Sequence, residues 1–115
     1  MKEIMEALKA FRKERNWEQY HTPENLAKSI AIESAELLEH FQWDDVPVSI
    51  EGVKDELADV IIYALLLNDH YGFDLDRIIK AKMLKNAKKY PIDKAYGNAK
   101  KYTELRKEKT NGNNR

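Results

Sequence analysis

Apolar residues recur along the chain at intervals of three and four positions, the spacing that places them on one face of an α-helix. Ile4, Leu8 and Phe11 show this spacing in the first segment. No segment shows the apolar and polar alternation that is typical of a β-strand. The pattern predicts four helices, which cover residues 2–15, 23–41, 50–70 and 75–90.

Residues at the ends of these segments support the helix boundaries. Thr22 followed by Pro23 is typical of a helix start, with threonine as the N-cap and proline at the first helical position. Gly72 follows the third segment, Asp74 can cap the fourth, and Pro91 ends it. With only four glycines and three prolines in 115 residues, the chain has few places to turn. The predicted fold class is all-α, a four-helix bundle.

Length and composition limit the class of protein. A chain of 115 residues has room for one domain, expected over residues 1–105, with a disordered polar tail over 106–115. Cysteine is absent, which excludes disulfides and thiolate chemistry. The longest uncharged apolar run, residues 60–67, is too short to cross a membrane, and the first residues include acidic ones. We expect a cytoplasmic protein, and a core this small favours a homo-oligomer.

Charge is distributed unevenly although the net charge is zero. Residues 1–76 hold 7 Lys and Arg against 17 Asp and Glu, whereas residues 77–115 hold 13 against 3. Overall neutrality argues against a polymeric nucleic acid as partner. The basic part can either bind a small anionic ligand or attract the acidic part of the same chain.

Four acidic residues form two matched pairs. Glu33 and Glu36 lie three residues apart on the second predicted helix, and Glu56 and Asp59 on the third. Residues 42–49 are predicted to be a loop, so the two helices form an antiparallel hairpin. Glu36 and Glu56 are each ten residues from Val46, and Glu33 and Asp59 are each thirteen. An ideal hairpin therefore places the four carboxylates level with one another in two rows.

Apolar neighbours suggest that these rows face inward, where like charges repel unless a cation lies between them. Oxygen ligands suit a hard ion, so we expect Mg²⁺, with Mn²⁺ as a substitute. A di-iron site is disfavoured because none of the four acids is followed by histidine at the third position. The alternative is that the acids are simply solvated on the helix surface.

Other side chains are candidates for binding an anionic or aromatic ligand. Lys82, Asn86 and Lys89 share one face of the fourth helix and could hold phosphate oxygens, or be solvated. Tyr63 continues the carboxylate face by one turn. Aromatic rings near the ends of the second helix suit a nucleobase or a core, and these are Trp17, His21 and Trp43. His40 and His70 have no metal-binding spacing and are interpreted as structural or surface residues.

Glu33-Ser-Ala-Glu36, followed after nineteen residues by Glu56-Leu-Ala-Asp59, resembles the E-x-x-E…E-x-x-D signature of the MazG-like all-α nucleoside triphosphate pyrophosphohydrolases. The likeness to their dCTP pyrophosphatase branch extends over about residues 8–105. It is carried by residues 15–26, 39–43, 82–91 and 101–103. The loop at residues 42–49 is shorter than in the vertebrate members of that branch.

The resemblance implies a Mg²⁺-dependent enzyme that splits a nucleoside triphosphate, dCTP or a modified dCTP, into the monophosphate and pyrophosphate. The metal ligands would be Glu33, Glu36, Glu56 and Asp59, with Glu33 or Glu36 as the base. Lys82 and Asn86 would contact the phosphates. The nucleoside pocket would include His21, Asn25, Trp43 and Tyr63. The family's members assemble as dimers or tetramers, and a non-catalytic helical module that senses nucleotides or binds a partner protein is the alternative function.

Overall fold

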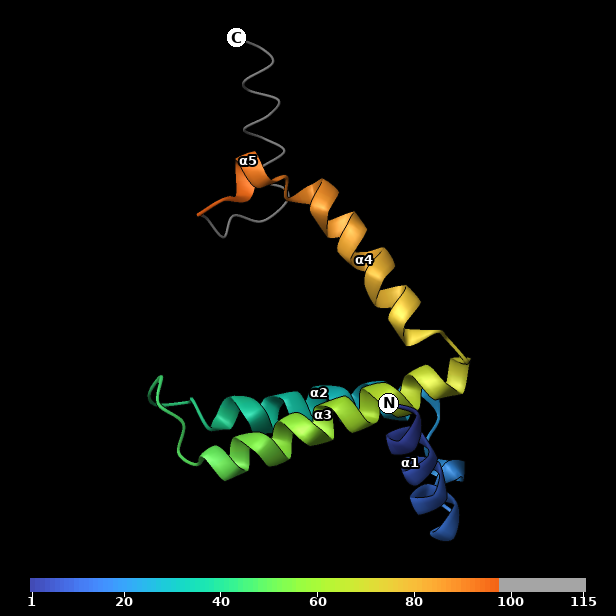
Figure 1. Cartoon of the computed structure of the whole chain (residues 1–115). Coiled ribbons are helices and arrows are strands. Elements are labelled where there is room, and N and C mark those ends of the chain that lie inside the picture. The colour runs from blue at the N-terminus through green and yellow to red at the C-terminus, as the bar shows by residue number, and fades with distance from the viewer. Residues whose placement is uncertain (98–115) are drawn as a thin grey trace. The chain divides into compact units, whose positions relative to one another are not determined.

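Helices form over all four predicted segments. The computed structural model describes residues 1–97 and contains α1 (Lys2–Glu14), α2 (Pro23–Glu39), α3 (Ile50–Tyr71) and α4 (Leu75–Lys89) (Figure 1). It also contains a short 3₁₀ turn, Glu18–Tyr20, and a one-turn helix α5 (Ile92–Ala95) that the sequence pattern did not indicate. No strand occurs among these 97 residues, so the all-α prediction is confirmed.

Side chains cap three of the helices at their first residues. Thr22, Ser49 and Asp74 each accept a hydrogen bond from the backbone N–H three residues further on, at 3.2, 3.0 and 3.2 Å. These bonds satisfy backbone donors that have no partner within the helix. α3 ends at Gly72, whose φ of +68° is strained for other residues. The predicted caps at Thr22 and Asp74 are confirmed, and Ser49 is an additional one.

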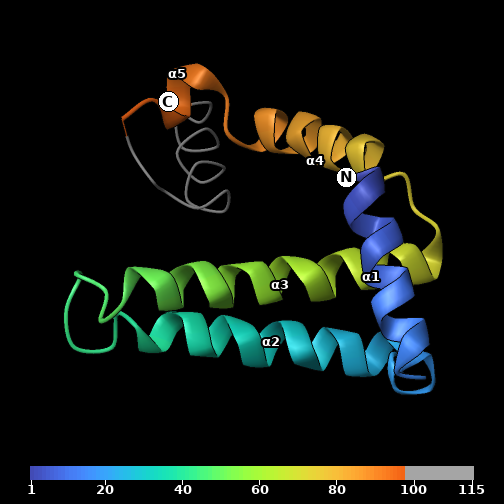
Figure 2. The ribbon, with the colours of Figure 1, turned by 60° about the horizontal axis from the view of Figure 1, so that its bottom comes forward.

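The first unit of the chain, Met1–Phe73, is built on an antiparallel hairpin of α2 and α3. The two helices lie side by side, and α1 crosses α3 at the end far from their connecting loop (Figure 2). Lys9 and Arg12 of α1 contact Asp69 of α3 at 3.0 and 3.5 Å. Among residues 1–97 the buried apolar side chains are Leu26, Leu65 and Leu66, and of these Leu26 is fully buried.

The second unit begins at Asp74 and contains α4 and α5. Within the described residues, α4 has no buried side chain, and it leaves Ile78, Ile79, Met83 and Leu84 exposed. Packing of this helix into a four-helix bundle, and a single domain over 1–105, stay predictions. The predicted tail at 106–115 lies outside the described residues.

No helix within the described part of the chain combines the length and the apolar character needed to cross a bilayer.

Candidate active site

The carboxylates of α2 and α3 approach one another across the hairpin. A hydrogen bond with the Glu36 carboxyl, together with burial, raises the pKa of Glu33 to about 7. The negative charges of Glu36, Asp59 and Glu56 act in the same direction. Of the two acids on α3, Asp59 has the larger effect, which agrees with the predicted pairing of Glu33 and Asp59 at one level of the hairpin.

The donor chemistry of this cluster fits a hard divalent cation. Glu33 Oε2 is buried and has no hydrogen-bond partner among the described residues, as expected for an atom that binds a ligand from outside the chain. A cation would also relieve the repulsion between the carboxylates. As the side chains stand, however, no three His, Asp or Glu residues within 1–97 are close enough together to hold an ion.

Glu56 is directed toward a histidine that sequence reasoning did not assign to the site. His40 Nε2 lies 2.7 Å from Glu56 Oε2, and both side chains are mostly buried, 17% and 22% exposed. The signal was present in the sequence, because His40 lies four residues after Glu36 and therefore shares its helix face. His70 is exposed, as interpreted from the sequence.

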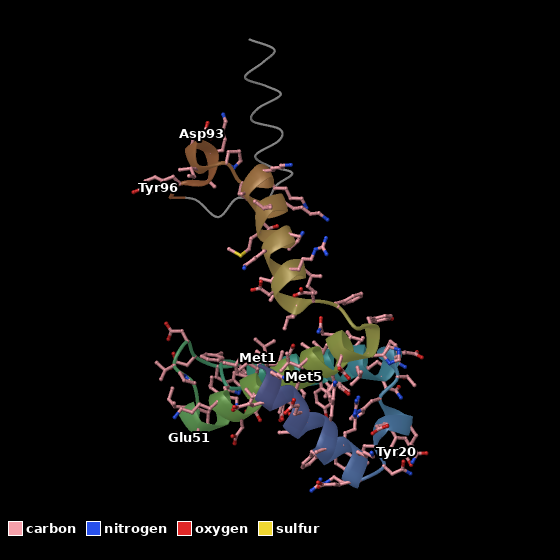
Figure 3. The ribbon with its side chains drawn as sticks, turned by 45° about the vertical axis from the view of Figure 1, so that its right-hand side comes forward. Met1, Met5, Tyr20, Glu51, Asp93 and Tyr96 are labelled. Atoms are coloured by element: carbon pink, nitrogen blue, oxygen red, sulfur yellow. The ribbon has the colours of Figure 1, made fainter. Side chains whose placement is uncertain are left out.

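A cavity of about 530 Å³ lies beside Asp59, at the end of the hairpin where α1 crosses. Figure 3 labels Tyr20 near this end and Glu51 near the opposite, loop end. Apolar and aromatic side chains dominate the walls of the cavity. The residues that line the cavity come from α1, from the segment after it and from α3. They are Ile4, Ala7, Leu8, Phe11, Arg12, Trp17, His21, Asp59, Ile62, Tyr63 and Leu66, and Arg12 and Asp59 are the charged ones.

Polar atoms in the walls of this cavity lack partners. Arg12 Nε and His21 Nδ1 are buried without a hydrogen bond from any described residue. Burial, and then the charge of Arg12, lower the pKa of His21, so its imidazole is neutral at pH 7 and offers both a donor and an acceptor. The His21 ring packs edge-on to Trp17 and to Tyr63, each with ring centroids 6.5 Å apart.

Tyr63 connects the cavity with the carboxylate cluster. Burial, followed by the charges of Glu33, Asp59 and Glu36, raises the pKa of its hydroxyl, which therefore stays protonated at neutral pH. Asp59 also belongs to both, since it lines the cavity and its negative charge contributes to the raised pKa of Glu33. The structure thus places an acidic cluster directly beside an aromatic cavity.

Two predicted site residues of the first unit, Asn25 and Trp43, do not line the cavity. The Asn25 amide donates to the backbone oxygen of Tyr20 at 3.0 Å, and Trp43 is 87% exposed in the loop between α2 and α3. Lys82 and Asn86 belong to the second unit, so their contact with phosphates stays a prediction. Sequence reasoning missed the part of α1 in the cavity wall, above all Arg12, although Leu8 and Phe11 marked its apolar face.

Comparison with known proteins gives consistent results. Residues 28–105 match the model of the MazG-like family. The chain is 38% identical to dCTP pyrophosphatase 1 of Rattus norvegicus and 36% identical to that of Homo sapiens, each over 83% of this chain. It spans 61% of the length of these relatives. A crystal structure of a pyrophosphatase from Archaeoglobus fulgidus is similar to it with a TM-score of 0.71 and 44% identity, over 79% of this chain and 92% of that one.

Proposed function

The chain belongs to the MazG-like family, and from this premise we propose that it hydrolyses nucleoside triphosphates to the monophosphate and pyrophosphate with Mg²⁺. dCTP or a modified dCTP is the proposed substrate, since the relatives named dCTP pyrophosphatase 1 match most of the chain. One observation carries the proposal: Asp59 belongs both to the acidic cluster and to the wall of the aromatic cavity. The observation supports a site in which metal ligands would lie next to a nucleoside pocket.

The acidic cluster would hold the metal through Glu33, Glu36, Glu56 and Asp59. When bound, Mg²⁺ would offset the repulsion between these acids and the triphosphate and polarise a phosphorus–oxygen bond. Mn²⁺ is expected to substitute, because it prefers the same oxygen donors.

Glu33 and Glu36 are the proposed proton acceptors for the attacking water. In the metal-free chain a hydrogen bond with Glu36, together with burial, raises the pKa of Glu33 to about 7, and in the metal complex whichever carboxylate oxygen of this pair is not bound to the cation would take the water's proton as a general base. The water oxygen would form a new bond to phosphorus while the α–β anhydride bond breaks. The bridging oxygen would leave with the pyrophosphate.

The cavity would hold the nucleoside. Its volume of about 530 Å³ is within the usual range for small-molecule sites, and aromatic rings suit a base. Neutral His21 and the Tyr63 hydroxyl would supply the polar contacts, with Trp17 as a further ring. The resemblance adds Asn25 and Trp43 to this pocket, and Lys82 and Asn86 to the phosphates.

A homodimer or homotetramer is the proposed assembly. Several large apolar side chains of α4 are exposed, and few side chains of residues 1–97 are fully buried. A second copy of the chain could cover such surface, in line with the small core expected for this length. Neither a polymeric nucleic acid nor a membrane is a proposed partner.

Pyrophosphate release from the canonical dNTPs and NTPs, with Mg²⁺ and with a chelator, tests the function. We expect Mg²⁺-dependent release, fastest with dCTP or with a 5-modified dCTP added to the panel. Asp59→Asn should abolish release, whereas Glu24→Gln, at an exposed residue of α2, should not. Nucleotide binding that raises the melting temperature without release would instead support the sensing module.

A further inference from the structure

The His40 side chain reaches from the end of α2 to a carboxylate of α3. Its Nε2 is 2.7 Å from Glu56 Oε2, a short distance for a bond between nitrogen and oxygen. The other ring nitrogen, Nδ1, is buried and has no partner within the described part of the chain. Glu56 is therefore the one hydrogen-bond partner of this ring among residues 1–97.

The backbone around His40 holds the ring in place. The His40 N–H donates to the Leu37 oxygen at 3.3 Å, which closes the last turn of α2. The His40 carbonyl oxygen accepts from the Val48 N–H at 3.1 Å, so the loop returns to this residue before α3 begins. Bonds on both sides restrict where the imidazole can point.

Gly52 makes space for the ring on α3. A Cβ added at this position would overlap His40 Cε1 and lie 2.8 Å from Nε2. Glycine is a poor helix former, so a glycine within the first turn of a helix calls for a packing reason. Contact with the imidazole supplies that reason, because any larger residue would push the ring away from Glu56.

We propose that His40 is a positioning residue that holds the Glu56 carboxylate in place for the metal. The inference rests on the proposed function, in which Glu56 is a ligand. In this role His40 would hold Oε2 of Glu56, and Oε1 would bind the cation. Residues that orient metal ligands in this way often change metal affinity or activity by about 10-fold to 100-fold when they are replaced.

Four variants separate this role from a structural one. His40→Leu keeps the side chain's bulk but removes the hydrogen bond, and His40→Gln keeps a donor. Gly52→Ala retains the imidazole, removes its space, and improves helix propensity. His70→Leu is the matched control, because His70 is an exposed histidine in the last turn of α3, far along the helix from Glu56.

Mn²⁺ affinity of the nucleotide-free protein, measured by electron paramagnetic resonance, is the main readout. We expect His40→Leu and Gly52→Ala to weaken Mn²⁺ binding by about 10-fold to 100-fold, His40→Gln to restore part of it, and His70→Leu to bind as wild type. kcat for pyrophosphate release should fall in parallel, with KM for the nucleotide little changed.

Melting temperature without metal is the second readout. A lower melting temperature in His40→Leu with unchanged Mn²⁺ affinity would overturn the positioning role and show a structural one. Wild-type Mn²⁺ affinity in Gly52→Ala would also overturn the positioning role. If Mn²⁺ binding depends on His40 but wild type releases no pyrophosphate, the proposed function fails and the positioning role stands. A wild-type chain that binds no Mn²⁺ would overturn both.

Discussion

The two ends of the α2–α3 hairpin differ in how far the chain itself supplies hydrogen-bond partners for their side chains. At the loop end, Glu56 has a hydrogen-bond partner in His40, and Gly52 makes space for that partner. At the end where α1 crosses, Glu33 Oε2, His21 Nδ1 and Arg12 Nε are buried without partners among the described residues. At the loop end His40 Nδ1 is also without such a partner, but the chain itself supplies a partner for the Glu56 carboxylate, whereas the three polar atoms toward the other end have none.

The buried polar atoms without partners are informative because each of them destabilises the fold. A buried polar atom without a hydrogen bond destabilises a protein by about 1–3 kcal/mol. Two of them, His21 Nδ1 and Arg12 Nε, belong to residues in the wall of one cavity, which indicates a site whose missing partners come from a ligand. In the proposed function a metal ion would complete the carboxylates, and a nucleoside would complete His21 and Arg12.

The largest expected effect comes from substituting Asp59, which belongs both to the acidic cluster and to the cavity wall. Asp59→Asn keeps the size of the side chain but removes a negative charge from the cluster and from the cavity wall. We expect the rate of pyrophosphate release to fall about 1,000-fold, since a bound metal ion contributes several kcal/mol to the transition state. Circular dichroism should show unchanged helix content.

The control for Asp59→Asn is Glu24→Gln, which removes an exposed acid of α2 that pairs with Lys28 at 3.0 Å. This variant should retain the wild-type rate. Normal turnover in Asp59→Asn would contradict the assignment of the cluster as the metal site.

The hairpin itself follows from the sequence because its determinants are local. Capping of α2 by Thr22 and the left-handed Gly72 at the end of α3 depend only on neighbouring residues. The loop position then fixes which carboxylates are level, and the larger effect of Asp59 than of Glu56 on the pKa of Glu33 agrees with that inference. Composition and helical spacing were sufficient for this much.

Two parts of the site depend on how the helices rotate and cross, which spacing along one helix does not specify. His40 meets Glu56 only for one rotation of α2 against α3. The cavity exists because α1 crosses α3, so Arg12 enters its wall through tertiary packing. Trp43, in contrast, was predicted from the family resemblance, and in the structure its ring is exposed in the loop.

Metal addition should stabilise the hairpin by the next largest amount. Mg²⁺ at about 100 times its dissociation constant should raise the free energy of unfolding by about 2.7 kcal/mol, because it binds the folded state alone. Thermal melts at matched ionic strength, with Mg²⁺ or with KCl, measure this. In Asp59→Asn we expect Mg²⁺ to leave the melting temperature unchanged. If millimolar Mg²⁺ also left the melting temperature of wild type unchanged, the acids would be merely solvated.

A pH effect should come from Glu33 in the metal-free protein. Its pKa rises from 4.5 to about 7 on folding, so between these values the folded state binds more protons than the unfolded state. The free energy of unfolding should therefore decrease as pH rises from about 4.5 to about 7. After allowance for screening by water, the decrease should be on the order of 1 kcal/mol.

Urea denaturation with EDTA at pH 5 and pH 8 measures this decrease. Glu33→Gln cannot ionise, so the variant should lose this part of the decrease and exceed wild type in stability at pH 8. Glu24→Gln should follow the wild-type profile. Equal pH dependence in wild type and Glu33→Gln would mean that Glu33 ionises as an ordinary surface acid.

The smallest expected effect distinguishes the two cations of α1 near the cavity. Arg12 and Lys9 both contact Asp69, but of the two only Arg12 is a cause of the lowered His21 pKa. Arg12→Met should therefore raise the pKa of His21, measured by NMR titration of the imidazole, but not back to its ordinary value, because burial remains the larger cause. Lys9→Met should leave it unchanged. If both variants raised this pKa equally, the effect would come from the shared contact with Asp69. The charge of Arg12 would then not act directly on His21.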